Sequence, residues 1–78
     1  MHTCKELVEH IVKTLVDKPE FVHITTAAVD HKLVINVKVD DSDLGRVIGK
    51  DGQTIRALRA LALIVAPRGQ EISVDVLK

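Results

Sequence analysis

The sequence is poor in aromatic residues. Phe21 is the only one among 78 residues, and tryptophan and tyrosine are absent. Binding surfaces that stack successive nucleotide bases on aromatic rings need several such side chains. An aromatic stacking platform is therefore excluded, and the 46% of residues that are hydrophobic predict a core of aliphatic side chains.

Cysteine and long apolar segments are also scarce. Cys4 is the only cysteine, so no disulfide can form within the chain, and we expect its side chain to be buried or half-buried. No apolar run approaches the length of a transmembrane helix, and the first residues lack the apolar region of a signal peptide. We therefore expect one domain over residues 1–78, located in the cytoplasm and without a membrane partner.

The sequence has no net charge, because 11 Lys and Arg residues balance 11 Asp and Glu residues. A protein that coats polyanions by charge alone would carry a large positive excess. The charges are unevenly placed, however, since all of the arginines (Arg46, Arg56, Arg59 and Arg68) lie in the second half of the chain. Charge alone leaves open whether they form a binding surface or a solvated helix surface.

Hydrophobic periodicity predicts three helices and three strands. Thr3 and Glu6 match a capping box at the start of the first helix, and Gly49 and Gly52 separate two later helices. The order α-β-β-α-α-β predicts an α+β fold with the three helices packed on one face of a three-stranded sheet. The predicted elements are a helix over 4–17, strands over 21–28 and 33–39, a short helix over 44–48, a longer helix over 53–66 and a strand over 72–76.

The loop Gly49-Lys50-Asp51-Gly52, between the last two helices, allows two interpretations. A connection this short requires glycine on steric grounds, so it can be a purely structural turn. The same loop exposes backbone N–H groups at the start of a helix, where the dipole favours an anion and glycine lets a phosphate backbone come close. A nucleotide-binding P-loop is excluded, because the spacer after Gly45 is one residue short and Asp51 replaces the Ser or Thr that binds magnesium.

Residues 44–55, LGRVIGKDGQTI, resemble the signature of KH domains, and the predicted order of elements resembles the bacterial type II arrangement of that family. The whole chain further resembles the small stand-alone bacterial KH proteins of the KhpA family. The resemblance implies an RNA-binding protein that clamps about four nucleotides of single-stranded RNA beside the glycine loop. It also implies an RNA chaperone or post-transcriptional regulator that works with a second KH protein.

The resemblance also implies roles for individual residues. Lys50 would meet phosphate, while Gly45, Ile48 and Ile55 would line one wall of an apolar groove against which bases lie. The opposite wall would come from residues 34–38, with the loop 28–31 as its rim. The residues implied in RNA binding are Ile35, Lys38, Gly45, Arg46, Ile48, Gly49, Lys50, Asp51, Gly52, Ile55, Arg56 and Arg59.

Asp51 departs from what a phosphate-binding loop should contain, because it places a carboxylate next to Lys50. The repulsion is small if the side chain points to solvent, and an acidic residue suits the first turn of the following helix. We therefore expect weak RNA binding without a partner, with a dissociation constant of about a micromolar or weaker.

Catalysis has little support in the sequence. His2, His10, His23 and His31 show no spacing that would bring them together as metal ligands. A single cysteine with scattered histidines and acidic residues does not assemble a nucleophile with its base and orienting group. We expect a binding protein rather than an enzyme, without metal, cofactor or small-molecule substrate.

The longer helix carries more apolar residues than one buried face requires. On a helical wheel Ile55, Leu58, Ala62 and Val65 share the face expected to meet the sheet. One explanation is a helix buried deeply within its own domain. The other, which we favour, is an interface for a homodimer or for a heterodimer with a second KH protein, and a KH-like interaction module with little RNA affinity is the alternative function. The expected interface residues are Ala57, Ala60, Leu61 and Ile64.

Overall fold

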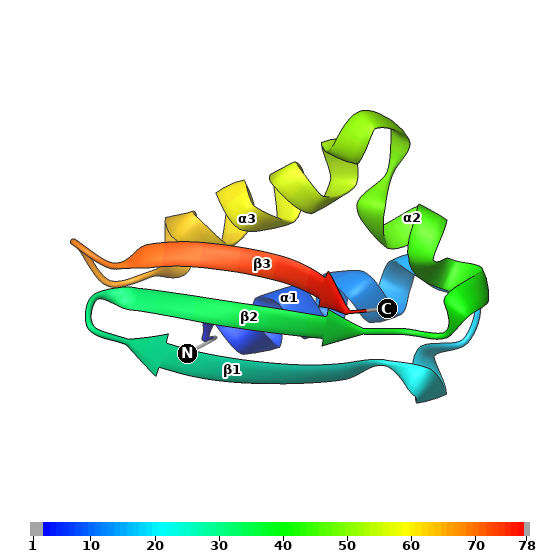
Figure 1. Cartoon of the computed structure of the whole chain (residues 1–78), viewed down its shortest axis with the longest axis horizontal. Coiled ribbons are helices and arrows are strands. Elements are labelled where there is room, and N and C mark those ends of the chain that lie inside the picture. Colours follow the sequence, from blue (N-terminus) through cyan, green and yellow to red (C-terminus); the bar gives the residue numbers. More distant parts are fainter. Residues whose placement is uncertain (1–2, 78) are drawn as a thin grey trace.

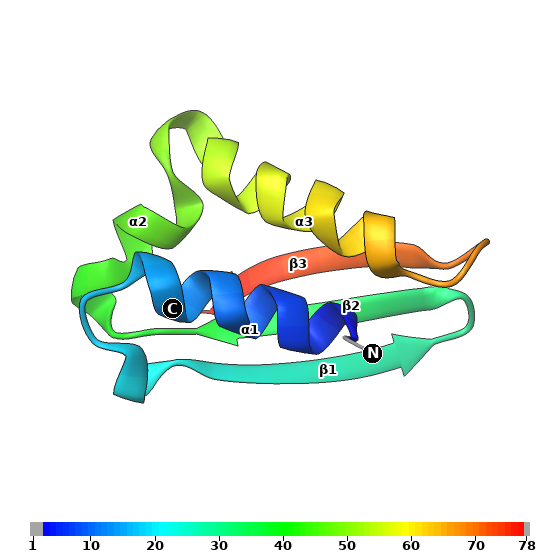
Figure 2. The same ribbon diagram turned by 180° about the vertical axis from the view of Figure 1, so that it is seen from behind.

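Helices cover one face of a three-stranded sheet and leave the other face open (Figures 1 and 2). The computed structural model describes residues 3–77. The α+β class and the order of elements are confirmed. The helices are α1 (Cys4–Leu15), α2 (Leu44–Ile48) and α3 (Gln53–Val65), the strands are β1 (His23–Val29), β2 (Lys32–Lys38) and β3 (Glu71–Leu77), and 3-10 turns occupy η1 (Pro19–Phe21), η2 (Asp41–Asp43) and η3 (Lys50–Gly52).

Helix α1 begins at the predicted capping box and ends earlier than predicted. The Thr3 hydroxyl accepts a hydrogen bond from the Glu6 backbone N–H at 3.1 Å, which satisfies one of the free donors of the first turn. At the other end Val16 takes extended backbone angles, so Asp17 lies outside the helix. The backbone N–H of Asp17 is instead bonded to the carboxylate of Asp43, far along the chain.

The sheet has the order β1-β2-β3, with β2 in the centre. Strands β1 and β2 form an antiparallel hairpin in which Val29 pairs with Lys32, whereas β2 and β3 run parallel, with Lys32 opposite Glu71. Strand β1 starts at His23 rather than at Phe21, because η1 closes with a hydrogen bond from the Val22 N–H to the Pro19 carbonyl.

The core lies between the sheet and the helices, and it is aliphatic as expected. Cys4 is buried, and its thiol donates to the Ala62 carbonyl at 3.3 Å, which joins α1 to α3. The assignment of Val65 to the buried face of α3 was wrong, since 41% of this residue is exposed. Helix α3 ends there, and Ala66 packs against the core in its place. The buried apolar residues are Cys4, Val8, Val12, Val16, Val22, Ile24, Ile35, Val37, Val39, Val47, Leu58, Ala62, Ile72 and Val74.

The helices of this fold are short. Over residues 3–77, none of them has both the length and the apolar character that a membrane crossing requires.

Candidate nucleic-acid interface

The glycine loop starts where α2 ends, at a residue that must be glycine. Gly49 has φ 77° and ψ 168°, a region that residues with a side chain hardly ever adopt. A Cβ atom at this position would also lie 2.8 Å from both the Cβ and the backbone N of Thr54 in the first turn of α3. The close approach of Gly49 to Thr54 therefore explains why glycine is needed here, whether or not the loop binds a ligand.

The rest of the loop leaves backbone donors free. Asp51 (φ 55°) and Gly52 (φ 75°) are both left-handed, and the Gly52 N–H closes the turn onto the Gly49 carbonyl at 3.1 Å. Within the described part of the chain, no backbone acceptor is found for the N–H groups of Lys50 and Asp51. A turn of this kind, with free N–H groups before a helix, is suited to an anion.

Basic side chains continue from this loop along α3. Lys50 is exposed in the loop, and the Arg56 guanidinium passes so close to Gly52 that a Cβ there would lie 3.5 Å from its Nη1. Arg59 follows one turn later and donates from Nε to the Ile72 carbonyl of β3 at 3.0 Å. Three positive charges therefore form a row that runs from the loop to the edge of the sheet.

A groove of about 300 Å³ lies at the end of this row, between α3 and β3. Arg59 and Leu63 line it from the helix, and β3 supplies the opposite wall. Residues 34–38 of β2, which were predicted to form this wall, do not line the groove, and β2 contributes only its first residue, Lys32. The groove residues are Lys32, Arg59, Leu63, Gln70, Glu71, Ile72 and Ser73.

Two residues predicted to bind RNA, Ile35 and Lys38, lie on β2 outside this groove. Ile35 has no exposed surface and belongs to the core, so it cannot touch a ligand. Lys38 is exposed but follows the buried Val37, and alternation along a strand turns its side chain to the open face of the sheet. Two residues of the predicted rim 28–31, Asp30 and His31, line a different hollow of about 420 Å³. They share it with the loop 67–70 that precedes β3.

Gly45, Ile48 and Ile55, the residues predicted to form an apolar wall, lie on or beside α2 and α3. Gly45 is exposed on α2, and no atom lies within 4 Å of the position a Cβ would take. Ile48 and Ile55 are half-buried on either side of the glycine loop. None of the three lines the groove between α3 and β3, and their contact with a base stays a prediction.

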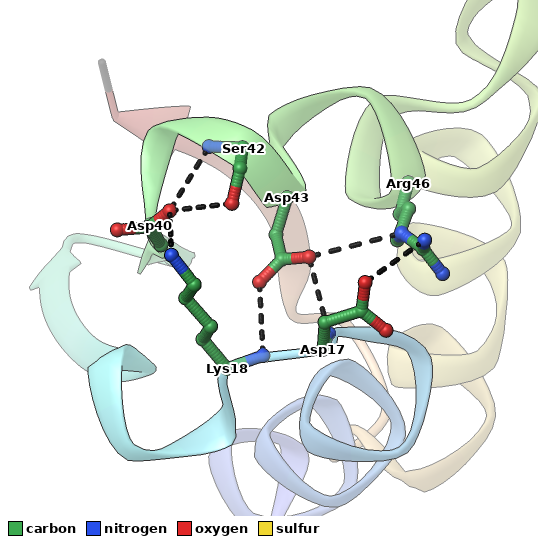
Figure 3. Close-up of polar contacts among 6 residues, drawn as sticks. All are labelled: Asp17, Lys18, Asp40, Ser42, Asp43 and Arg46. Carbon is green, nitrogen blue, oxygen red and sulfur yellow. Dashed lines mark hydrogen bonds and ion pairs between the residues drawn. The ribbon is translucent and has the colours of Figure 1, made fainter.

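Arg46 belongs to a different set of contacts, shown in Figure 3. Its Nη2 lies 3.0 Å from the Asp17 carboxylate and its Nε lies 3.7 Å from the Asp43 carboxylate. Arg46 is therefore turned towards the end of α1, and the row of basic residues described above does not include it.

Asp43 is a buried residue whose structural role sequence reasoning missed. Only 1% of it is exposed, and its two oxygens accept the backbone N–H groups of Asp17 and Lys18, each at 3.1 Å (Figure 3). Asp43 and Arg46 stand three residues apart, a spacing that favours an ion pair and was the one available signal. The two hydrogen bonds from the backbone of Asp17 and Lys18 to Asp43 fix the start of α2, and hence the glycine loop, against the end of α1. We call these two bonds the Asp43 joint.

Asp40 stabilises the same region from the surface. The Ser42 hydroxyl and the Ser42 backbone N–H both donate to its carboxylate, and Lys18 lies 3.5 Å away. The hydrogen bonds from Ser42, with a smaller contribution from the Lys18 charge, hold the pKa of Asp40 below its ordinary value of 3.8.

The comparison with known families decides the identity of this arrangement. The KhpA/KhpB KH domain family matches residues 5–77, which is nearly the whole chain. The chain belongs to this family. Among its relatives, the RNA-binding protein KhpA of Chlamydia trachomatis is 39% identical over 75 residues, covering 95% of this chain and 96% of the relative. The KhpA of Clostridium perfringens is 44% identical over 62 residues, covering 80% and 83%.

Solved structures agree on the KH fold. Era, in a crystal structure with MgGDPNP and nucleotides 1506–1542 of 16S ribosomal RNA, superposes with a TM-score of 0.58 at 24% identity. The match covers 95% of this chain and 30% of that chain. A variant of Aquifex aeolicus Era gives a TM-score of 0.53 at 22% identity, with the same coverage. At these identities the likeness shows the fold alone.

The KH domain also exposes an apolar surface on the far side of α3 from the sheet. Ile64 is 77% exposed and Leu61 is 41% exposed, so the interpretation of α3 as a deeply buried helix was wrong. Ala57 and Ala60 are exposed beside them. A shallow hollow of about 300 Å³ continues this surface onto α1, and its apolar lining comes from Ile11, Leu15, Ala57, Leu58 and Leu61. We call the whole area the helix surface.

The histidines are dispersed over this KH domain. His10, His23 and His31 are all exposed on separate elements, and His2 lies outside the described residues. Across positions 3 to 77, no three His, Cys, Asp or Glu side chains come together in a way that could hold a metal ion.

Proposed function

We propose that this protein binds single-stranded RNA along the row formed by Lys50, Arg56 and Arg59. The RNA backbone would pass over the glycine loop, and bases would enter the groove between α3 and β3. Two findings support the proposal. The chain belongs to the KhpA/KhpB KH domain family, and the relatives described above are named RNA-binding proteins.

The observation that carries the proposal is the form of the loop from Gly49 to Gly52. Its free N–H groups and the exposed Lys50 offer donors and charge to a phosphate, while the Arg56 guanidinium adjoins Gly52 from the next helical turn. No aromatic residue lines the groove, because Phe21, the one aromatic residue of the sequence, lies on η1 outside it. Base recognition therefore depends on hydrogen bonds and apolar contact rather than on stacking.

The affinity for RNA should be weak. Asp51 places a carboxylate beside Lys50. The row holds three basic side chains and the groove adds Lys32, so few counterions are released on binding. Weak binding to many sequences suits an RNA chaperone or a post-transcriptional regulator acting in the cytoplasm. We assign this protein to that role as a binding protein rather than an enzyme.

A second function is favoured by the helix surface. The exposure of Ile64 and Leu61 next to two alanines lets another helix approach closely, and such a surface is typical of an interface. A homodimer, or a heterodimer with a second KH protein, would bring two RNA grooves together and raise the avidity of weak sites. If RNA binding fails, self-association through this surface remains as the alternative function.

Fluorescence anisotropy with short single-stranded RNA, single-stranded DNA and an RNA duplex tests the proposal. Lys50→Ala should weaken binding to single-stranded RNA by about three- to tenfold and lower the salt dependence, because one phosphate contact is lost. Arg46→Ala is the matched control. It removes the same charge from the preceding helix, but its guanidinium faces Asp17, so binding should change little.

Two outcomes would contradict the proposal. Equal losses in the two variants would mean that only net charge matters, and no binding of any RNA by the folded parent would mean that the loop is a structural turn.

A further inference from the structure

The two edges of the sheet are protected very differently. The β3 edge lies next to α3, where Arg59 bonds to the Ile72 carbonyl, and the strand carries the charges of Glu71 and Asp75. The β1 edge has no neighbouring strand among the described residues. Figure 1 shows β1 along one side of the molecule, with α3 along the opposite side.

Strand β1 has none of the features that normally protect an edge. Its sequence, HITTAAV, contains no lysine, acidic residue, proline or glycine. All of its residues except Ile24 are exposed. Natural proteins usually place charges, prolines or bulges on such edges, because a regular uncharged strand with free backbone groups is a template for pairing with another strand.

The hairpin defines which backbone groups of β1 are free. A two-residue turn, Asp30 and His31, makes Val29 and Lys32 the first hydrogen-bonded pair of the ladder. Alternation along the strand then directs the N–H and C=O groups of Ile24, Thr26 and Ala28 away from β2. These three residues form the free edge.

We propose that the β1 edge pairs antiparallel with β1 of a second copy of this chain, with the two-fold axis at Thr26. Full overlap of the strands then places Thr26 opposite Thr26 and Ile24 opposite Ala28, so each free residue meets another free residue. These pairs would form about six backbone hydrogen bonds across the interface, two for each hydrogen-bonded pair.

The side chains of β1 are compatible with this pairing. On the helix side of the sheet, Ile24 meets Ala28 and the two threonines can exchange hydrogen bonds. On the open side, Thr25 meets Ala27 and His23 meets Val29. In this pairing no charged side chain faces another. Strand β3 is less suited to such pairing, because it carries Glu71 and Asp75.

The contact is separate from the helix surface. The α3 part of the helix surface and β1 lie along opposite sides of the molecule (Figure 1), so both can be occupied at once. Pairing of one short strand buries less area than a stable interface of about 1,600 Å² requires, so this association is weak and depends on concentration.

Amide hydrogen exchange by NMR provides the first test. We would use full-length Ile64→Glu, which removes self-association through the helix surface, over concentrations from roughly 0.05 to 2 mM, where a weak interface becomes populated. The amides of Ile24, Thr26 and Ala28 should exchange more slowly as the concentration rises, while those of Thr25 and Ala27 are already protected by β2. Exchange at Ile24, Thr26 and Ala28 that does not change with concentration would overturn the proposal.

A charge swap provides the second test, in the same background. Thr26→Lys and Thr26→Glu each place like charges opposite one another across the axis, so each variant alone should stay monomeric in NMR diffusion measurements. An equimolar mixture should associate again, because lysine then faces glutamate. A mixture that diffuses like the separate variants, or single variants that associate as strongly as their background, would exclude pairing at this residue.

Discussion

The two halves of α3 differ in what they present to the surroundings. The first half follows the glycine loop and carries Arg56 and Arg59 towards β3. The second half presents Leu61 and Ile64 to solvent on a side without charges. One helix of 13 residues thus serves a polar surface suited to a polyanion and an apolar surface suited to another protein.

The two halves also depend on different supports. The loop half is held from outside α3, by the close passage of Gly49 past Thr54 and by the Asp43 joint. The apolar half is held by the buried Leu58 and Ala62 and by the Cys4 thiol. Substitutions should therefore affect one half without the other.

Gly49→Ala should disturb the glycine loop and the first half of α3 more than any other substitution proposed for them. The new side chain would meet Thr54, and the backbone angles of Gly49 are unfavourable for alanine, so the free energy of unfolding should fall by about 3 kcal/mol. RNA affinity should fall as well, because the loop must rearrange. Chemical denaturation and anisotropy measure the two effects.

Gly45→Ala is the control for Gly49→Ala. Gly45 is helical with open space around it, so alanine should raise the stability by about 0.5–1 kcal/mol. If both variants lost the same stability, the special geometry of Gly49 would be disproved.

Asp43→Asn sharpens the comparison by weakening a support of the loop half alone. The amide cannot accept both backbone N–H groups of Asp17 and Lys18, so the free energy of unfolding should fall by about 2 kcal/mol. RNA binding should weaken while self-association through the helix surface is retained in the folded fraction. The exposed neighbour Asp41→Asn should change stability by less than about 0.5 kcal/mol, and a similar loss there would argue against the Asp43 joint.

Ile64→Glu addresses the apolar half. Because Ile64 is 77% exposed, the variant should keep its stability within about 0.5 kcal/mol and bind RNA through an intact loop, yet sediment as a monomer. Phe21→Glu, at a residue 50% exposed on η1, should leave association unchanged. A parent protein that is already monomeric at tens of micromolar would remove the idea of an interface on α3.

The smallest effect is expected from the titration of Asp40. Its pKa is lowered in the folded state, so the stability it contributes is present above its unfolded pKa of about 3.8 and is lost as the pH falls through the lower folded value. NMR titration of the carboxyl carbon should place that value below 3.8. Ser42→Ala should raise it, because the hydroxyl donor is lost; an unchanged value would assign the shift to another cause.

Local features of this fold were predictable from the sequence. The capping box of Thr3 and Glu6, the alternation along β2 and the glycine pair around Lys50 depend on residues that are close in the chain. The glycine loop also carried the resemblance to KH domains, and with it the family. Predictions that needed only local spacing therefore agree with the structure within a few residues.

Long-range pairing was the part that local spacing could not provide. The sequence did not reveal that β3 runs parallel to β2 at the edge. The groove wall was therefore predicted at residues 34–38 of β2, whereas the groove beside α3 is lined mainly by the start of β3. Arg46 was likewise assigned by its place in the motif, although its partners come from the end of α1 and from Asp43. The exposure of Val65 depended on where α3 ends, which is least certain from sequence.

The parallel pairing of β2 with β3 has a consequence for the order in which the molecule assembles. The β1–β2 hairpin pairs residues that are close in the chain. Lys32 and Glu71, by contrast, are separated in the chain by α2 and α3. Contacts between distant residues form slowly, so we expect β3 to dock last and to detach first in partial unfolding. The groove exists only while β3 is docked. A ligand bound there would therefore stabilise the docked strand and protect the amides of β3 from exchange.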